Sequence, residues 1–131
     1  MGNLSVLILS RSMAGKELLG VVRKRVGSMN IDCHTLTFNP DATDNIVFPH
    51  ISGRIRNINK GRGVIVLVDS DATHQTLLQR LADECPAIVV SGFNDAMLDA
   101  IRHCEALDLQ QAADLLADAA RTAIKTYQKH D

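Results

Sequence analysis

Residues 4–19 read LSVLILSRSMAGKELL and join an apolar run to a polar turn and the start of an amphipathic segment. The run from Leu4 to Leu9 is nearly continuous Leu, Val and Ile, which is typical of a strand buried on both faces. From Met13 to Val26 the apolar residues recur on one helical stripe, and Gly27 can end that helix. This stretch therefore predicts a buried strand, a short turn and a helix.

The alternation of strand and helix continues along the chain. Three further apolar runs predict strands, and the first of them alternates in polarity, as expected nearer a sheet edge: 31–38, 63–68 and 87–90. Apolar residues at helical spacing predict helices at 43–59, at 73–85, after a cap at Asn94, and at 109–123. Pro49 is expected to kink the helix at 43–59 or to delay its start.

Strands that alternate with helices indicate an α/β fold. We expect one domain over residues 1–131, with three α/β/α layers around a mainly parallel four-stranded sheet. In such sheets the functional site lies beyond the carboxyl ends of the strands. This rule selects the loops 10–12, 69–74 and 91–94. The candidate binding residues in these loops are Ser10, Arg11, Ser12, Asp69, Thr73 and Asn94.

The composition excludes several classes of partner. The net charge of the 131 residues is −1, which gives no general attraction to nucleic acid or to an acidic membrane. No signal peptide and no run long enough to span a bilayer are visible, so we expect a cytoplasmic protein without membrane insertion. Cys33, Cys85 and Cys104 lack CxxC or Cys/His spacing, so we expect reduced thiols, no metal and no cofactor.

Three motifs occur in the order and spacing of a known family. They are GRGVIVLVD at 61–69, VVSGFNDAML at 89–98 and DLQQAADLLADAARTAIKTYQK at 108–129. The chain resembles a mannose-type enzyme IIA domain of the bacterial sugar phosphotransferase system. The resemblance implies a role in carbohydrate transport, with a phosphocarrier protein and sugar-transporter subunits as partners. It also implies a homodimer in which a C-terminal strand crosses, antiparallel, to the partner's sheet. Residues 122–127 match that strand, and a continued helix is the open alternative.

The chain departs from the family in two loops. The family's first loop reads Thr-His-Gly and carries the phosphorylated histidine, whereas this chain has Ser10-Arg11-Ser12, with Leu18-Leu19 fixing the register. The family's loop after the third strand reads Asp, two residues, Gly-Gly-Ser-Pro. Here Asp69 is kept, but Ala-Thr-His-Gln occupies 72–75. Divergence confined to these loops indicates altered chemistry on a retained fold.

Arg11 cannot replace the histidine chemically. A phosphoryl acceptor needs a nitrogen lone pair, and a guanidinium has none available and stays protonated. Three arrangements are open: Arg11 pairs with Asp69 and fills the old site, Arg11 binds an anion or a partner's carboxylate, or the two residues do not meet.

His74 is the other residue that bears on phosphoryl transfer. It could serve as a relocated phosphohistidine, with Ser10, Ser12 and Thr73 as nearby donors, or it could be a solvent-exposed histidine at a helix start. Three functions follow: an active phosphocarrier, a non-phosphorylatable regulatory or interaction module, and a small-anion-binding module. Enzyme activity is therefore undecided, and the absence of the acceptor histidine favours the second function.

Overall fold

The computed structural model describes residues 3–131 and contains one sheet of parallel strands. The strands are β1 (Ser5–Ser10), β2 (Asp32–Thr37), β3 (Val64–Val68) and β4 (Ala87–Ser91), in the spatial order β2-β1-β3-β4. All four lie within a residue or two of the predicted runs. The alternating strand, β2, lies at the edge of the sheet, as predicted.

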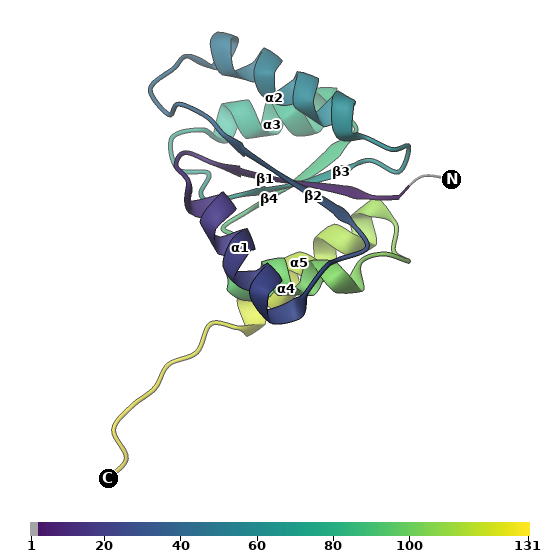
Figure 1. The fold of residues 1–131 in the computed structure, drawn as a ribbon. Helices are drawn as coiled ribbons and strands as arrows, with labels where there is room; N and C mark the ends of the chain where they lie inside the picture. The colour runs from purple at the N-terminus through teal and green to yellow at the C-terminus, as the bar shows by residue number, and fades with distance from the viewer. Residues whose placement is uncertain (1–2) are drawn as a thin grey trace.

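Helices cover both faces of the sheet. They are α1 (Ala14–Val26), α2 (Asp44–Ile58), α3 (Gln75–Glu84), α4 (Asp95–Ala100), the 3-10 turn η1 (Ile101–His103) and α5 (Leu109–Thr122). Figure 1 shows α2 and α3 on one face and α1, α4 and α5 on the other. The fold is therefore the three-layer α/β/α arrangement predicted from the sequence.

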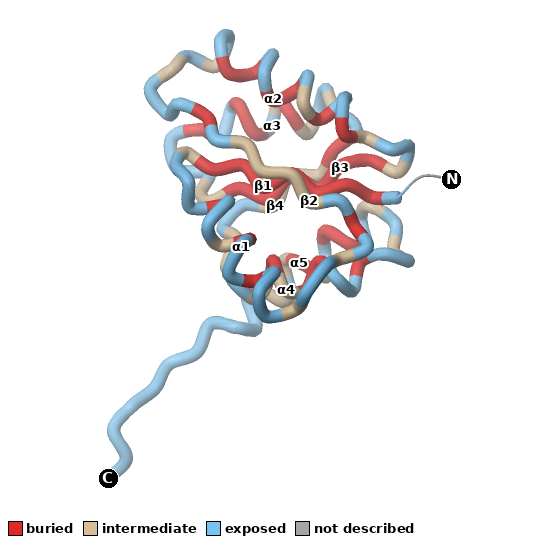
Figure 2. The backbone as a smooth tube through the Cα atoms, in the orientation of Figure 1, coloured by how far each residue is buried: buried red, intermediate tan, exposed pale blue. Residues whose placement is uncertain are grey.

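The central strands are buried on both faces, as Figure 2 shows. Side chains of β1 alternate between two apolar clusters: Val6 and Ile8 pack with α1, α4 and α5, whereas Leu7 and Leu9 pack with α2 and α3. This double burial explains why β1 and β3 consist of continuous apolar runs.

The prediction that Pro49 delays its helix is wrong. The helix α2 begins at Asp44 and continues through Pro49 to Ile58. Proline lacks the N–H that would donate to the carbonyl of Asn45. Both residues are exposed, so water can satisfy that carbonyl and the helix tolerates the loss.

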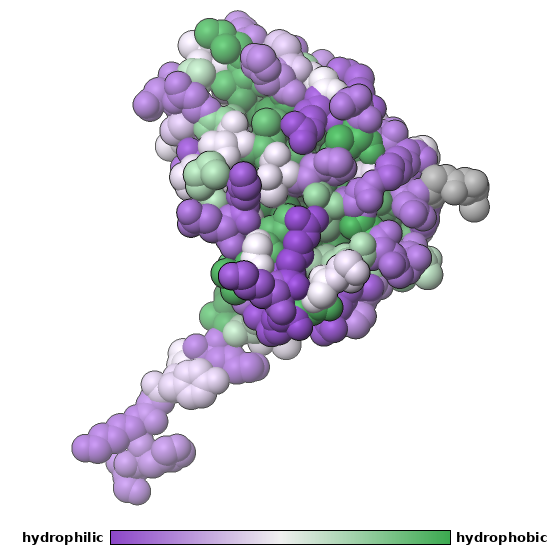
Figure 3. All heavy atoms as spheres, viewed as in Figure 1, coloured by the Kyte–Doolittle hydropathy of each residue, from purple (hydrophilic) through white to green (hydrophobic). Residues whose placement is uncertain are grey.

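The chain leaves the domain after α5. Residues 123–131 form neither helix nor strand and extend away from the other elements in Figure 1. Ile124 is 77% exposed and Tyr127 is 92% exposed. The alternative of a helix continued through residue 127 is therefore wrong, because α5 ends at Thr122. Figure 3 shows this tail as a mostly hydrophilic projection from the body of the molecule.

Candidate functional site

The two strands at the centre of the sheet end side by side, where the chain topology changes direction. From β1 the chain moves outward to β2, and it then returns to place β3 on the other side of β1. In parallel sheets, ligands bind at such a switch point, outside the carboxyl ends of the strands. Arg11 follows β1 and Asp69 follows β3, so both residues lie at this point.

Asp69 links the ends of these two strands. Its Oδ2 accepts hydrogen bonds from the Arg11 backbone N at 3.1 Å and from Arg11 Nε at 3.4 Å, and its Oδ1 accepts from Ser70 N at 2.9 Å. Of the three arrangements left open by the sequence, the one in which Arg11 and Asp69 do not meet is wrong. The pair uses one carboxylate oxygen, so it is not the bidentate form.

The backbone bond is the stronger part of this contact. The side chains of Arg11 and Asp69 are 30% and 19% exposed, and partly exposed ion pairs contribute only about 0–1 kcal/mol. A charged acceptor for a part-buried backbone N–H contributes more, about 1.5–3 kcal/mol. Asp69 therefore acts first as a clamp between the ends of β1 and β3, and second as the partner of the guanidinium.

Ser10 and Ser12 bind the beginning of α1. Ser10 Oγ donates to Ser12 O at 2.6 Å and accepts from Gly15 N at 3.2 Å, and Ser12 Oγ accepts from Ala14 N at 3.2 Å. Ser10 is 2% exposed, so a ligand in solvent does not reach it. Ser12 is exposed and its hydroxyl hydrogen is still available to an acceptor. Of the two serines proposed as donors, the structure leaves only Ser12 accessible.

His74 is buried, so the prediction of a solvent-exposed histidine is wrong. It is 8% exposed, and its ring meets Phe38 edge-on with centroids 5.2 Å apart. Nε2 lies 3.3 Å from Pro40 O, and Nδ1 lies 3.0 Å from Thr73 Oγ1. A carbonyl only accepts, so Nε2 carries the proton and Nδ1 accepts from the Thr73 hydroxyl. With both nitrogens engaged, neither presents a free lone pair to a phosphoryl donor.

Thr73 adopts a backbone conformation that favours glycine. Its φ is +70°, and it is the only non-glycine residue with positive φ in residues 3–131. Left-handed backbone costs a β-branched residue about 1–2 kcal/mol. Position 73 corresponds to the second glycine of the family's Gly-Gly-Ser-Pro pattern, from which this chain departs. The loop thus has a backbone conformation that favours glycine at a position occupied by threonine. The buried, hydrogen-bonded side chain of the adjacent His74 stabilises this conformation.

Asn94 has a structural role in this conformation. Its Oδ1 accepts from Met97 N at 2.9 Å, which confirms the predicted cap of α4, and its Nδ2 donates to Ala120 O at 3.0 Å. The amide therefore connects the start of α4 to the end of α5, and both of its polar atoms are used within the protein.

Three residues near the site were not singled out from the sequence. Phe38 and Pro40 contact His74 from the segment after β2, and no local sequence pattern predicts contacts between residues so far apart in the chain. Gly15 lies so close to β1 that an added Cβ would approach Ile8 Cγ2 to 2.7 Å. A glycine beside a strand end is the signal that could have identified this close approach.

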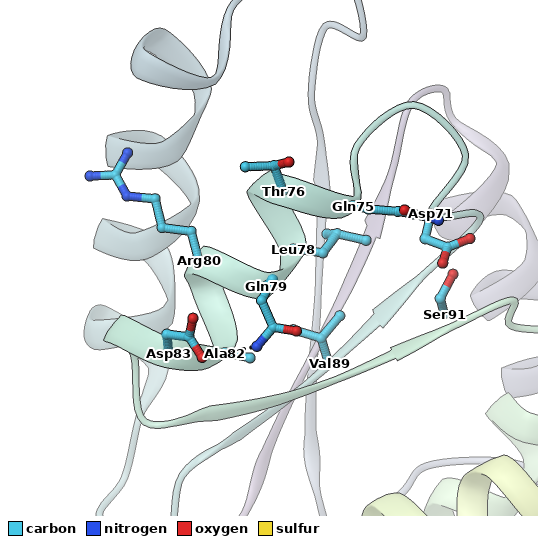
Figure 4. Close-up of a pocket in the computed structure, with 10 residues that line it drawn as sticks. All are labelled: Asp71, Gln75, Thr76, Leu78, Gln79, Arg80, Ala82, Asp83, Val89 and Ser91. Carbon is cyan, nitrogen blue, oxygen red and sulfur yellow. Dashed lines mark hydrogen bonds between the residues drawn. The ribbon is translucent and has the colours of Figure 1, made fainter.

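Two open grooves lie along β4, which pairs only with β3. One, of about 790 Å³, runs between α3 and β4, and Figure 4 shows Asp71, Gln75 and Ser91 at one end of it. The other, of about 400 Å³, lies between β4 and α5 and includes Ile124 of the tail. Arg11 lines neither groove.

Within residues 3–131 no group of three or more His, Cys, Asp or Glu is arranged to hold a metal ion. In the same part of the chain, no helix combines the length and apolar character that crossing a membrane requires.

Comparisons with known proteins identify solved structures with a similar fold. No protein-family model and no curated protein matches the chain. The mannose/sorbose-specific IIA subunit of the phosphotransferase system from Enterococcus faecalis matches with a TM-score of 0.81 at 16% identity, over 97% of this chain and 96% of that one. The phosphotransferase-system IIA protein associated with the fucose utilization operon of Streptococcus pneumoniae matches with a TM-score of 0.73 at 18% identity, over 95% and 93%.

A third similar structure has a different kind of name. A sigma-54 interaction domain protein from Enterococcus faecalis matches with a TM-score of 0.67 at 7% identity, over 92% of this chain and 93% of that one. The similarity spans nearly the whole chain in each case, and the resemblance read from the sequence is confirmed at the level of the fold. The chain has the fold of the mannose-type IIA proteins of the sugar phosphotransferase system.

Proposed function

We propose that this protein is a IIA-like component of the phosphoenolpyruvate-dependent sugar phosphotransferase system that no longer accepts phosphate and serves as a regulatory or interaction module. The observation that carries the proposal is Arg11. In the register that Leu18-Leu19 sets in the sequence, Arg11 aligns with the acceptor histidine of the resembled family. In the structure its backbone and side chain are held by Asp69. A protonated guanidinium in that position has no nucleophilic lone pair.

Two further observations support a regulatory role. The scaffold is retained across nearly the whole length of the phosphotransferase-system structures, so a docking face for their partners can persist without the chemistry. The fold also occurs in a protein named for sigma-54 interaction, so it is not confined to proteins named as transport components. The partners under this proposal are a phosphocarrier protein and sugar-transporter subunits, and the protein acts in the cytoplasm.

The alternative of an active carrier depends on His74. Its burial and its two hydrogen-bonded nitrogens oppose that role. A small-anion-binding module is the other alternative, and it would use Arg11 and Ser12. Neither groove along β4 includes Arg11, so neither of these two hollows would enclose an anion bound to its guanidinium.

Incubation with phosphoenolpyruvate, enzyme I and the phosphocarrier protein tests the proposal. We expect intact mass spectrometry to show no added phosphoryl group, and binding measurements to show a complex with the carrier. A histidine-containing IIA protein in the same mixture is the positive control. Acid-labile phosphate that disappears in His74→Ala would establish the active carrier instead. Absence of both label and complex would leave the anion-binding module.

We further propose that the protein forms a homodimer through the unpaired edge of β4. The edge strand presents unsatisfied backbone groups, which commonly pair with another strand. The extended tail begins beside this edge, where Ile124 lines the groove between β4 and α5. Beyond it, Tyr127 is 92% exposed in a single chain. An antiparallel strand from a second copy would cover the edge and the exposed apolar side chains together.

Light scattering of the full chain and of a variant ending at Thr122 tests the dimer. We expect the full chain to have the mass of two copies and the shortened chain the mass of one. The variant Tyr127→Ser serves as a milder change that keeps the tail length. A monomeric mass for the full chain at high concentration would contradict the proposal.

A further inference from the structure

Arg11 has donors that the protein itself does not use. A guanidinium carries five N–H donors in a planar fork. Only Nε contacts Asp69, at 3.4 Å, and among residues 3–131 no hydrogen bond joins Arg11 Nη1 or Nη2 to another protein group. The side chain is 30% exposed, so it is partly open to solvent.

Asp69 orients the guanidinium from one side. The carboxylate holds Nε and is itself fixed by two backbone N–H groups, those of Arg11 and Ser70. This support reduces the side-chain freedom that a ligand would otherwise have to restrict. The edge formed by Nη1 and Nη2 matches two oxygens of a phosphoryl group or a carboxylate. Ser12, on the same loop, is exposed and can donate its hydroxyl hydrogen while its oxygen accepts from Ala14 N.

The surroundings favour an anion that a larger partner carries. The positive charge of Arg11 is already offset by Asp69, and neither groove along β4 includes Arg11. A free small anion would therefore contact one partly neutralised guanidinium outside both grooves, which favours weak binding. A phosphoryl group on a docked protein needs only this contact, because the surrounding protein surface supplies the rest of the affinity.

We propose that Arg11 binds the phosphoryl group of the phosphorylated phosphocarrier protein, so that this protein distinguishes the phosphorylated from the unphosphorylated carrier. The inference rests on the proposed function, in which the carrier is a partner, and it adds that the carrier docks at the carboxyl edge of the sheet. No bond to phosphorus forms or breaks, since Arg11 donates hydrogen bonds and has no lone pair with which to attack. The module would report how much of the carrier is phosphorylated.

Affinities for the two forms of the carrier test this inference. We expect the wild-type protein to bind the phosphorylated carrier at least about tenfold more tightly than the unphosphorylated one, equivalent to about 1.4 kcal/mol. Arg11→Gln is expected to bind both forms equally, at the affinity that the wild type shows for the unphosphorylated form. Arg11→Lys keeps the charge but loses the fork, so an intermediate preference is expected.

Arg56→Gln is the matched control. Arg56 is exposed on α2 and lies near Cys85. Cys85 precedes the first residue of β4, so it lies at the amino ends of the strands, whereas Arg11 lies at their carboxyl ends. Its replacement removes the same charge and is expected to leave the preference unchanged. Unfolding curves of the Arg11 variants confirm that each one is folded at the temperature of the binding assay.

The outcomes separate the two proposals. Equal affinity of the wild-type protein for both carrier forms would overturn this inference and leave the proposed function intact. Failure of both forms to bind, or transfer of the phosphoryl group, would overturn the proposed function and this inference with it. Inorganic phosphate is the remaining probe. If phosphate alone raises the thermal midpoint of the wild type but not of Arg11→Gln, and the carrier forms bind equally, the anion is free and its assignment to the carrier is wrong.

Discussion

Replacement of Asp69 by alanine is expected to lower the free energy of unfolding by about 2–3 kcal/mol. The variant loses the acceptor for the Arg11 backbone N–H at 3.1 Å, the contact with Arg11 Nε at 3.4 Å and the bond from Ser70 N at 2.9 Å. The first bond is part-buried and charged, so it accounts for about 1.5 kcal/mol or more. The other two are also part-buried, but the Nε contact is long and the Ser70 bond joins neighbouring residues, so we expect each to contribute less than about 1 kcal/mol.

Arg11→Gln gives the contrast that identifies the cause. This variant loses only the side-chain contact, because the backbone N–H of residue 11 still donates to Asp69. We therefore expect it to lower the free energy of unfolding by about 0.5 kcal/mol. Asp69→Asn, which keeps an oxygen acceptor but not the charge, is expected to lie between the two. Urea denaturation followed by far-ultraviolet circular dichroism measures all three values.

A double-mutant cycle makes the argument refutable. If Asp69 acts chiefly on the backbone, the coupling energy between the two side chains should not exceed about 1 kcal/mol. Destabilisation by Arg11→Gln as large as that by Asp69→Ala would show that the ion pair, and not the backbone clamp, joins the ends of β1 and β3.

Three other measurements follow from the structure. His74→Ala should lower the free energy of unfolding by about 2–3 kcal/mol through the loss of its two hydrogen bonds and its aromatic contact, while the intact mass after incubation with the phosphotransferase mixture stays unchanged. Gly15→Ala should destabilise the protein by about 1–3 kcal/mol in urea, because the new Cβ would lie 2.7 Å from Ile8 Cγ2, and equal stability would show that the helix shifts freely. Burial raises the pKa of Cys33 and of Cys104 to about 11, so thiol labelling of these two residues at pH 8 should be slow in the folded protein. Since both folded pKa values lie above those of the unfolded chain, their contribution to stability is complete below about pH 9 and is lost as the pH rises through 11.

The layers of the fold could be predicted from the sequence, and so could the possibility that Arg11 and Asp69 lie close together. Strands buried on both faces can be recognised as continuous apolar runs. Because a parallel sheet brings the ends of β1 and β3 together, a contact between Arg11 and Asp69 could be considered before the structure was known. The atoms involved could not be predicted, because no pattern in the sequence distinguishes a carboxylate that accepts from a backbone N–H from one that forms a bidentate pair.

The environment of His74 shows where reasoning from sequence was insufficient. A histidine after a polar loop usually faces solvent, whereas here the segment after β2 folds over it and supplies Phe38 and Pro40. That contact joins parts of the chain 34 positions apart, and its existence depends on the path of a loop without periodicity. The same holds for the tail, whose composition suits a helix, a strand or an extended chain equally well.

The place of β1 at the centre of the sheet has a consequence for how the protein folds. Ser5 pairs with Asp32 on one side and with Val64 on the other, so the two neighbours of β1 are separated from it by 27 and by 59 positions. Strand pairings between segments so far apart in the sequence form slowly, because the entropy cost of closing a long loop comes before any stabilising contact forms. During synthesis β1 has only β2 beside it until β3 has emerged, and its second edge stays open for that time. β4 emerges last, and it keeps an open outer edge in the finished sheet, as β2 does on the other side.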